Sequence, residues 1–492
     1  MCLLGLLAPA CVAENTPQIT LDTNETLFTV LTAMNACGYD EELNVSDPVR
    51  LNVRAEVDQN LRVSDEAQTI ANDMCEFYRA HTGPDSGRDL AHFVSLALYL
   101  EGPPHFLPKV KEDQLPPDAA AIAGFAALLE RFYDKAGIHA IWERHKAQIA
   151  ALTDRYHEPL SKMLFDTEIY LKLPSAGYLG RAFTIYVDVM AAPGQTNARN
   201  YGTDYYVVIS PVGNSLKMDQ IRHTYLHYLL DPQAAKYPTS VKRLEPLLES
   251  VKSAPMDDVF KTDMSLLVIE SLIRAVEART AGTKKTLEGE RIQAVDDAMA
   301  QGFILTRYFY DALIAFEKDP AGIRSAFQEM LDKIDVKREA RRASEVEFAQ
   351  AAAPELLHLS RRNQAQVLTT AEKRLSAGDP KSAQELAQQA LDENLGDQGR
   401  ALFILAQVAV YNKDMKNARE YFERAIEAAK EPKVVAWSHV YLGRIFDLQE
   451  EREAALEQYR AALSAASAVP EVKAAAQRGI DQPYEPPATA AR

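Results

Sequence analysis

Two histidines carry the clearest chemistry in this chain: His223 and His227, which stand four positions apart in the run His-Thr-Tyr-Leu-His. On an α-helix, side chains at this spacing lie on one face, a single turn apart. Two imidazoles arranged in this way can bind one Zn²⁺ ion through their ring nitrogens. The spacing therefore predicts a metal site. The alternative is a helix on which one histidine is packed and the other is exposed.

Thr224 follows the first histidine directly. In the His-Glu-x-x-His motif of zinc peptidases, a glutamate at this position takes a proton from the metal-bound water. A threonine hydroxyl cannot accept that proton near neutral pH, because it is not a base in this range. The sequence thus predicts a site that holds metal without hydrolysing a substrate, and we assign no catalytic residue.

Glu270 is the predicted third ligand. It lies 43 residues after His227 (270 − 227), in an otherwise apolar helical run. A buried carboxylate needs a partner, which can be the metal or Arg274, one turn further along the helix. Glu277, on the same helix, is the second choice for the ligand position. The opposing interpretation makes Glu270 a surface carboxylate that is paired with Arg274.

Three further residues are considered for supporting roles. Asp219 precedes His223 by one turn on the same helix face, so we expect it to accept a hydrogen bond from that histidine, outside the metal's own ligands. Tyr308 and Tyr310 could offer hydroxyls to a developing negative charge. Aromatic packing in a helical core is the simpler expectation for both tyrosines. The other histidines are scattered along the chain and form no second ligand set.

The second histidine is followed by an apolar stretch and Asp-Pro, in Tyr228–Pro232. With the histidine spacing and the later glutamate, this ending resembles the glutamate-zincin (gluzincin) metallopeptidases over about Phe165–Ile334. The resemblance implies an α+β zincin-like fold with a small sheet, zinc as the cofactor, and the three ligands named above. Because threonine stands at position 224, it implies a degenerate domain without peptidase activity.

The elements that must position these residues follow from the hydrophobic pattern. Helical spacing from about Asn24 to Leu173 predicts a helical N-terminal region, including a long helix over Gly137–Phe165 that Pro159 breaks or bends. Phe183–Val189 and Tyr205–Ser210 are rich in β-branched and aromatic residues, so they predict two strands that form a hairpin or lie side by side.

The sequence between and after these strands predicts one connecting segment and several helices. Asn197–Gly202 is predicted to be turn-rich connecting sequence. The helix that carries the histidines is predicted over Leu216–Leu230 and ends at Asp231-Pro232. Further helices are expected at about 258–280, 288–316 and 320–334.

Small and large residues recur in the same order between about Val367 and Leu463. Ala383, Ala418 and Ala455 mark equivalent positions that are 35 (418 − 383) and 37 (455 − 418) residues apart. This spacing is close to the ~34-residue period of tetratricopeptide repeats, whose paired helices approach closely over small residues. The segment resembles these repeats, which implies an α-solenoid that binds a protein or peptide partner. Pro470–Ile480 is predicted to form its capping helix.

Arg400 and Arg444 lie on the first helices of their repeats. Contact with acidic groups of a ligand is one interpretation, and simple exposure to solvent is the other. Nucleic acid is not an expected partner, because a formal net charge of −16 repels phosphate backbones. No stretch of the sequence is long and apolar enough to span a bilayer, so no transmembrane segment is predicted.

The N-terminal segment Met1–Ala13 is typical of the apolar core of a secretory signal. It predicts export from a bacterial cell to the periplasm or envelope. Ala8–Cys11 is a weak lipoprotein box, so lipid anchoring stays open, and an apolar packing helix is the alternative to a signal. Cys37 and Cys75 either form a disulfide in an oxidising compartment or remain two buried, unpaired cysteines.

Together these patterns predict a mainly α protein. Its expected segments are a signal (1–13), a helical region (14–165), a zincin-like domain (166–345), a tetratricopeptide solenoid with a capping helix (346–480) and a disordered tail (481–492). The predicted function is protein–protein interaction through the solenoid, combined with an inactive metallopeptidase-like domain. Two alternatives are an active zinc peptidase with an unusual general base, and a structural repeat scaffold without metal.

Overall fold

The computed structural model describes residues 18–173, 181–213, 215–281, 288–354, 356–359, 364–376, 378–392, 397–429, 431–465 and 470–485. The predicted signal segment and positions 486–492 of the predicted tail lie outside these residues. The protein is mainly helical, with 69% helix and 6% strand, which confirms the predicted class. It divides into two compact units, 1–361 and 362–492.

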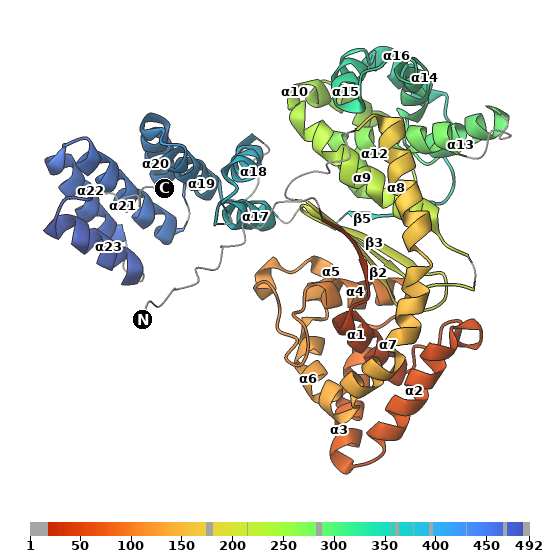
Figure 1. Ribbon diagram of the computed structural model, residues 1–492. Coiled ribbons are helices and arrows are strands. Elements are labelled where there is room, and N and C mark those ends of the chain that lie inside the picture. The colour runs from red at the N-terminus through yellow and green to blue at the C-terminus, as the bar shows by residue number, and fades with distance from the viewer. Residues whose placement is uncertain are drawn as a thin grey trace, which may run out of the picture. The chain divides into compact units, whose positions relative to one another are not determined.

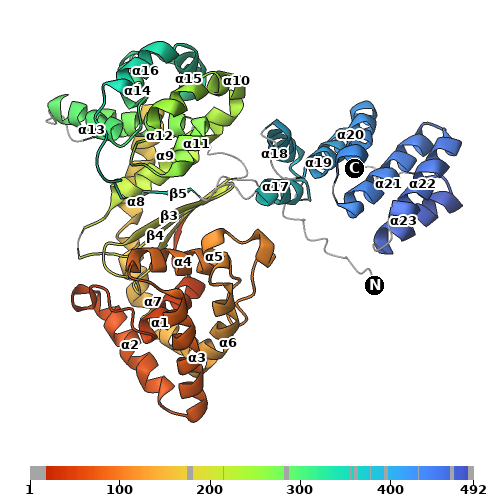
Figure 2. The same ribbon diagram turned by 180° about the vertical axis from the view of Figure 1, so that it is seen from behind.

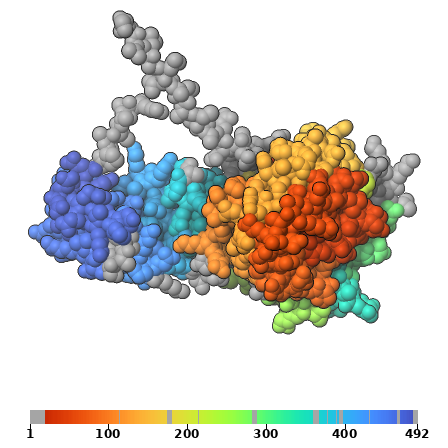
Figure 3. All heavy atoms as spheres, turned by 90° about the horizontal axis from the view of Figure 1, so that it is seen from below, coloured from red at the N-terminus to blue at the C-terminus, as the bar shows by residue number. Residues whose placement is uncertain are grey.

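The first unit begins with a strand and a layer of helices, which confirms the helical character predicted from about Asn24 onward. Side chains cap several of these helices: Asn24 accepts from the Leu27 N–H, and Ser64 from the Ala67 N–H. Seen from below, the layer forms a continuous packed surface (Figure 3). Its elements are α1 (Glu25–Ala36), η1 (Leu43–Val45), α2 (Pro48–Leu61), α3 (Asp65–His81), α4 (Ser86–Leu98), η2 (Glu112–Gln114), α5 (Pro117–Ala120), η3 (Ala123–Phe125), α6 (Ala126–Lys135) and α7 (Ile138–Asp154).

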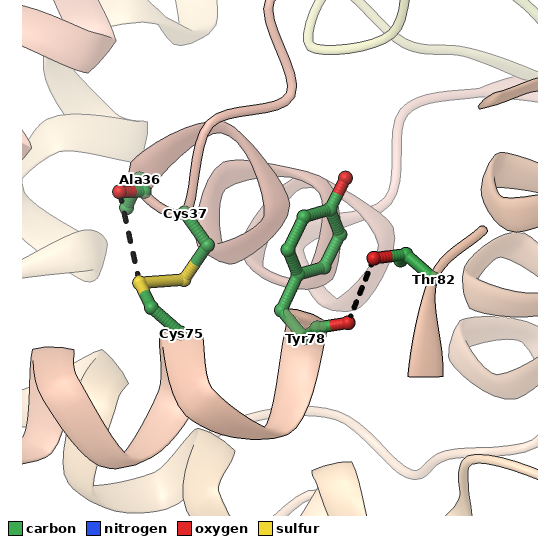
Figure 4. Close-up of a disulfide and its surroundings, with 5 residues drawn as sticks. All are labelled: Ala36, Cys37, Cys75, Tyr78 and Thr82. Carbon is green, nitrogen blue, oxygen red and sulfur yellow. Dashed lines mark hydrogen bonds between the residues drawn. A yellow bond between two sulfur atoms is a disulfide. The ribbon is translucent and has the colours of Figure 1, made fainter. Parts of the chain in front are cut away.

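A disulfide joins Cys37, at the end of α1, to Cys75 in α3 (Figure 4). The sulfur of Cys75 also lies 3.8 Å from the carbonyl oxygen of Ala36. Further along α3, the Thr82 hydroxyl donates to the Tyr78 carbonyl at 2.9 Å, which satisfies one of the acceptors left open at the helix end. Of the two alternatives left by the sequence, the paired state of these cysteines is the one observed.

The long helix predicted over Gly137–Phe165 is instead two helices, α7 and α8 (His157–Leu171). The break falls at residues 155–156, before Pro159 rather than at it. Pro159 is the third residue of α8, where a backbone N–H has no partner within the helix, so its missing donor costs nothing there. The predicted boundary between positions 165 and 166 therefore lies inside α8.

A small mixed sheet forms the middle layer of the first unit, with strand order β1-β2-β4-β3-β5. β2 pairs with β1 and β4 in parallel, β3 and β4 form an antiparallel hairpin, and β5 runs parallel to β3. The two predicted strands are thus confirmed as neighbours, with Phe183 opposite Tyr205. The strands are β1 (Gln18–Asp22), β2 (Ala182–Val187), β3 (Thr196–Tyr201), β4 (Asp204–Ile209) and β5 (His358–Leu359).

The prediction of a turn-rich connection over Asn197–Gly202 is wrong, because most of it forms β3. This strand has a polar sequence, and its place in the sheet is fixed by distant contacts. Arg199 is buried and pairs with Asp118, and its guanidinium also donates to the Ala91 carbonyl at 2.8 Å. Such tertiary contacts override the low strand propensity of the segment.

Side chains alternate between the two faces of the sheet, so that it separates two cores. Phe183, Ile185 and Val187 belong to the core on one side, while Tyr186 packs with the N-terminal helices on the other. Figure 1 shows the N-terminal helices on one face of the sheet, and α9 (Met218–Lys236) and α12 (Met264–Thr280) on the opposite face.

The second helical layer carries the candidate site. The predicted helix over 258–280 divides at Asp263, whose side chain accepts from the Ser265 and Leu266 N–H groups and so starts a new helix. The helix predicted over 288–316 divides near Gly302, at φ +112. The remaining elements are α9 (Met218–Lys236), α10 (Pro238–Lys242), η4 (Glu245–Val251), α11 (Asp258–Thr262), α12 (Met264–Thr280), α13 (Glu288–Ala300), α14 (Thr306–Phe316), α15 (Ile323–Asp332) and α16 (Val336–Ser344).

The second unit consists of paired helices (Figure 2). The predicted marker alanines Ala383, Ala418 and Ala455 are all fully buried. A methyl group added at Gly443 would lie 2.6 Å from the Tyr459 ring, so the helices meet too closely for a larger residue. The helices are α17 (Gln364–Ser376), α18 (Pro380–Asp392), α19 (Gln398–Tyr411), α20 (Met415–Ala428), α21 (Pro432–Leu448), α22 (Arg452–Ala465) and α23 (Pro470–Asp481).

The start of the solenoid lies later than the predicted position 346. Leu357 is buried in the core of the first unit, and His358–Leu359 is a strand of its sheet. The helix α23 occupies the position of the predicted capping helix.

Candidate metal centre

α9 has one aromatic face that packs on the sheet. The ring of Tyr225 lies 5.2 Å from that of Phe183, and the ring of Tyr228 lies 5.8 Å from that of Tyr205. Aromatic pairs at these distances stabilise the packing beyond simple burial. With this face fixed, α9 is held firmly against the sheet while the histidines of the same helix meet α12.

α9 does not end at Asp231-Pro232 as predicted, but continues to Lys236. A proline inside a helix removes the hydrogen bond to the carbonyl four residues earlier, here that of Tyr228. The guanidinium of Arg181 donates to this carbonyl at 2.6 Å. A side chain from the start of β2 therefore replaces the missing backbone donor, and the helix can pass through Pro232.

The two histidines and Glu270 come together between α9 and α12. The Nε2 atom of His227 lies 2.9 Å from Oε2 of Glu270, and the Nε2 atom of His223 lies 3.6 Å from the same oxygen. One ligand atom from each of the three residues lies within 4.8 Å of the other two. The Glu270 side chain is only 2% exposed, so the interpretation of a surface carboxylate is wrong.

Two further carboxylates hold the opposite nitrogens of the histidine rings. Nδ1 of His227 lies 2.9 Å from Asp231, and Nδ1 of His223 lies 2.9 Å from Glu277. A carboxylate that accepts from Nδ1 fixes the ring so that Nε2 is directed at the cluster. The Tyr205 hydroxyl donates to the other oxygen of Asp231 and so ties this carboxylate to the sheet.

The residue predicted for this supporting role, Asp219, is exposed in the first turn of α9. Asp231 and Glu277 lie in that role instead, and Glu277 is not among the three converging ligand residues. Asp231 stands four residues after His227, so the sequence carries its signal. The prediction missed it because it ended the helix at Leu230, one residue before Asp231.

The charges of the cluster stabilise one another. Burial alone would lower the pKa of His227, but the Asp231 and Glu270 carboxylates overcome this effect and raise it to about 10. The pKa of His223 is also raised, because Glu277 and Glu270 outweigh its burial. Burial would raise the pKa of Glu270, yet the nearby His223 and Arg274 hold it well below its usual range. These directions favour the imidazolium forms of the histidines and the ionised form of Glu270.

Thr224 is not placed to act as a general base. Its side chain is fully buried, and its hydroxyl donates to the Gln220 carbonyl of the same helix at 3.1 Å. The two tyrosines considered for oxyanion stabilisation are also engaged elsewhere. The Tyr308 hydroxyl donates to the Met330 carbonyl at 2.6 Å, and the Tyr310 hydroxyl donates to Glu288 at 2.7 Å.

A cavity of about 330 Å³ borders His223, Glu270 and Arg274. Arg274 donates from Nε to Oε1 of Glu270 at 2.7 Å, so the predicted pair between these residues is present inside the site. The cavity wall is mostly apolar and comes from segments far apart in the chain. It includes Met256, Phe260, Phe303 and Leu357. No sequence pattern predicted this wall, because its members share no spacing.

In the second unit, Arg400 forms a bidentate ion pair with Glu372 of α17, and both nitrogen–oxygen distances are 2.7 Å. Simple exposure is therefore the wrong interpretation for this arginine. Arg444 lies over the rings of Tyr441 and Tyr484, at 5.2 and 5.0 Å from their centres.

Comparison with known proteins identifies part of the second unit. Residues 397–468 match the tetratricopeptide repeat family. No curated protein and no solved structure matches the chain. The repeats are thus confirmed over this stretch, and they suggest that the protein interacts with other proteins. Across the part of the chain that the structure describes, no helix combines the length and apolar character needed to cross a membrane.

Proposed function

We propose that the protein recruits a partner protein through its solenoid and holds a divalent metal ion, with zinc as the first candidate, in a zincin-like domain that does not hydrolyse peptides. The observation that carries this proposal is the arrangement around Glu270. Two histidines direct Nε2 at one carboxylate oxygen. The position of the general base is taken by a threonine whose hydroxyl is bonded to its own helix.

The size of the cluster supports zinc. Ligand atoms on a tetrahedron around Zn²⁺ are about 3.3 Å apart when each lies ~2.0–2.1 Å from the ion. The two nitrogen–oxygen distances, 2.9 and 3.6 Å, lie on either side of this value. The carboxylates behind both histidines also suit a metal site, in which such partners orient the rings and increase their basicity.

The same contacts support a second candidate, a charge network that stabilises the fold without metal. Between Asp231 and Glu270, a protonated His227 donates from both ring nitrogens, and its raised pKa favours this state. In this candidate the cluster has only a structural role, as in the alternative of a repeat scaffold without metal. It differs from the first proposal in one measurable property, the metal content of the protein.

The test is elemental analysis of the full chain, purified without chelator, beside His227→Ala. The proposal expects about one zinc per chain in the wild type and a loss of most of it in the variant. His157→Ala serves as a control, since His157 is 61% exposed and lies on α8, outside the cluster. Wild-type protein that takes up no zinc, even after dialysis against zinc salts, would establish the metal-free network instead.

A second measurement separates the non-hydrolytic site from an active peptidase. Zinc-loaded wild type and His223→Ala are incubated with casein, with and without chelator. We expect equal, background cleavage in both. Chelator-sensitive cleavage by the wild type that the variant lacks would show that another residue replaces the general base.

Export remains part of the proposal for where the protein acts. The Cys37–Cys75 disulfide supports it, because disulfides persist in oxidising compartments and are rare in the reducing cytosol. Cell fractionation of the native protein tests it: recovery in the cytosolic fraction with both thiols free would exclude export.

A further inference from the structure

We propose that the cavity beside the histidine cluster binds a small carboxylate that carries an apolar group, with the carboxylate held between the metal ion and Arg274. This inference rests on the proposed metal site and adds the chemical class of its ligand. It depends on three features: the open coordination position of the ion, the position of Arg274, and the apolar wall.

The ion would have an open coordination position that can take an anion. Three protein ligands leave at least one coordination position of Zn²⁺ open. Glu270 is the single carboxylate among the ligand residues, and the Asp231 and Glu277 carboxylates lie behind the histidine rings. The positive charge beside the open position therefore comes from the ion and from Arg274.

Arg274 lies where it can contact such an anion. Its Nε is bonded to the metal-ligand residue Glu270, and its guanidinium lies 4.7 Å from the centre of the Phe303 ring. Among the described residues, its hydrogen bonding is confined to Nε, so the two terminal nitrogens remain for a ligand. The side chain borders the cavity and is 21% exposed. A planar guanidinium matches a carboxylate with two parallel hydrogen bonds.

Most of the remaining cavity wall suits an apolar group, and Asp257 and Gln301 are its polar members. Met256, Phe303 and Leu357 are each at most 5% exposed and line the wall together with Phe260. A volume of about 330 Å³ is at the small end for ligand pockets, which range over ~300–1,000 Å³. The ligand is therefore limited to about one aromatic ring or a short aliphatic chain beside its carboxylate.

The test is calorimetric titration of the zinc-loaded full chain with 3-phenylpropionate, with 3-phenylpropanamide and acetate as matched probes. The metal content is measured in every sample. We expect the amide to bind at least about 10-fold more weakly, because it lacks the charge. Acetate should also bind at least about 10-fold more weakly, because it lacks the apolar group. Arg274→Gln should lose at least about 10-fold in affinity for 3-phenylpropionate. Arg62→Gln, directly after α2, should leave the affinity unchanged.

A spectroscopic readout on the wild type covers the case in which Arg274→Gln no longer holds metal. In the cobalt-substituted protein, 3-phenylpropionate should change the visible absorption of Co²⁺, and the amide should not. Equal binding of acid and amide by metal-loaded protein would overturn the inference and leave the metal site standing. Wild-type protein that holds no metal would overturn both the inference and the proposed metal site. An unchanged cobalt spectrum at saturating acid would show that the carboxylate does not reach the ion.

Discussion

The histidine cluster between α9 and α12 and the helix contacts of the solenoid are both buried, but opposite chemistry holds them together. In the first, Glu270 lies among two imidazoles and a guanidinium, and each charged group depends on the others. In the second, buried alanines and glycines let the helices approach until the volume of the side chains at the contact limits them. One site is specified by charge partners and the other by small size, so different substitutions should disrupt them.

The two regions can be measured separately, because the chain has two tryptophans, one in each unit. Trp142 lies in α7 of the first unit, and Trp437 lies in α21 of the solenoid. Replacing either one by phenylalanine leaves the fluorescence of the other to report the unfolding of its own unit. Stability is therefore measured in these two single-tryptophan backgrounds.

The largest effect is expected for Glu270→Gln. Removing this charge leaves the imidazoles and Arg274 without their shared buried partner. Breaking a buried pair in this way costs about 3–5 kcal/mol. The free energy of unfolding of the metal-free protein, from urea titration followed at Trp142, should fall by this amount. The control Asp219→Asn changes an exposed residue of α9, and its effect should stay within about 0.5 kcal/mol. A loss below about 1 kcal/mol for Glu270→Gln would contradict a charge-dependent core.

The second effect tests the solenoid. A methyl group at Gly399 would lie 2.2 Å from the backbone nitrogen of Ala429. The backbone cannot move aside cheaply, so Gly399→Ala should reduce the stability read at Trp437 by about 1–3 kcal/mol. Gly289→Ala in α13, read at Trp142 of its own unit, is the control, because a methyl group there meets no atom within 4 Å. If both substitutions have the same effect, close approach of the helices is not what specifies this region.

The third effect concerns metal affinity. Asp231→Asn removes the carboxylate that holds Nδ1 of His227 while the ligand atoms themselves remain. Such changes behind a ligand weaken metal binding by about 10–100-fold. Competition with a chromophoric chelator measures the change, and Asp219→Asn should leave the affinity as in the wild type. An unchanged affinity in Asp231→Asn would mean that the ring of His227 is held in place without this contact.

The smallest effect is a pH dependence that only the first unit should show. Folding raises the pKa of His227 to about 10, from ~6.5 when unfolded. Its contribution to stability is therefore complete below pH ~6.5 and is lost as the pH rises toward 10. Between pH 7 and 9 the metal-free protein should lose up to about 1.4 kcal/mol per pH unit at Trp142. His227→Gln should flatten this slope. A slope that persists in the variant would assign it to other groups.

Metal binding should respond to pH in the opposite direction. The imidazolium protons must leave before Nε2 can bind an ion, so zinc affinity should rise from pH 6 to 8. Stability that falls with pH in the metal-free protein and affinity that rises with pH would together separate the charge network from the metal site.

Local pattern was sufficient for a large part of this protein. A spacing of four residues places His223 and His227 on one face of any helix, and an acidic residue in an apolar run identified Glu270 as buried and partnered. The repeat of small residues predicted the paired helices, because each pair is specified by contacts within one repeat period.

The same kind of reasoning failed where a distant group changed the local outcome. Pro232 should end a helix, and α9 continues because Arg181 supplies the missing donor to Tyr228. Polar residues 197–201 should form a loop, and they form β3 because Arg199 finds a buried carboxylate. In both cases the partner residue lies far away in the sequence, so no local pattern indicates it.

Periodicities of a few residues were therefore enough to predict which side chains share one helix face and which helices pair. The packing of distant segments set which carboxylates support the histidines and what surrounds the open side of the cluster. Asp231, Glu277 and the cavity wall act through contacts between segments that have no fixed spacing along the chain. Such contacts are set by how the layers pack around the sheet, and no local pattern records them.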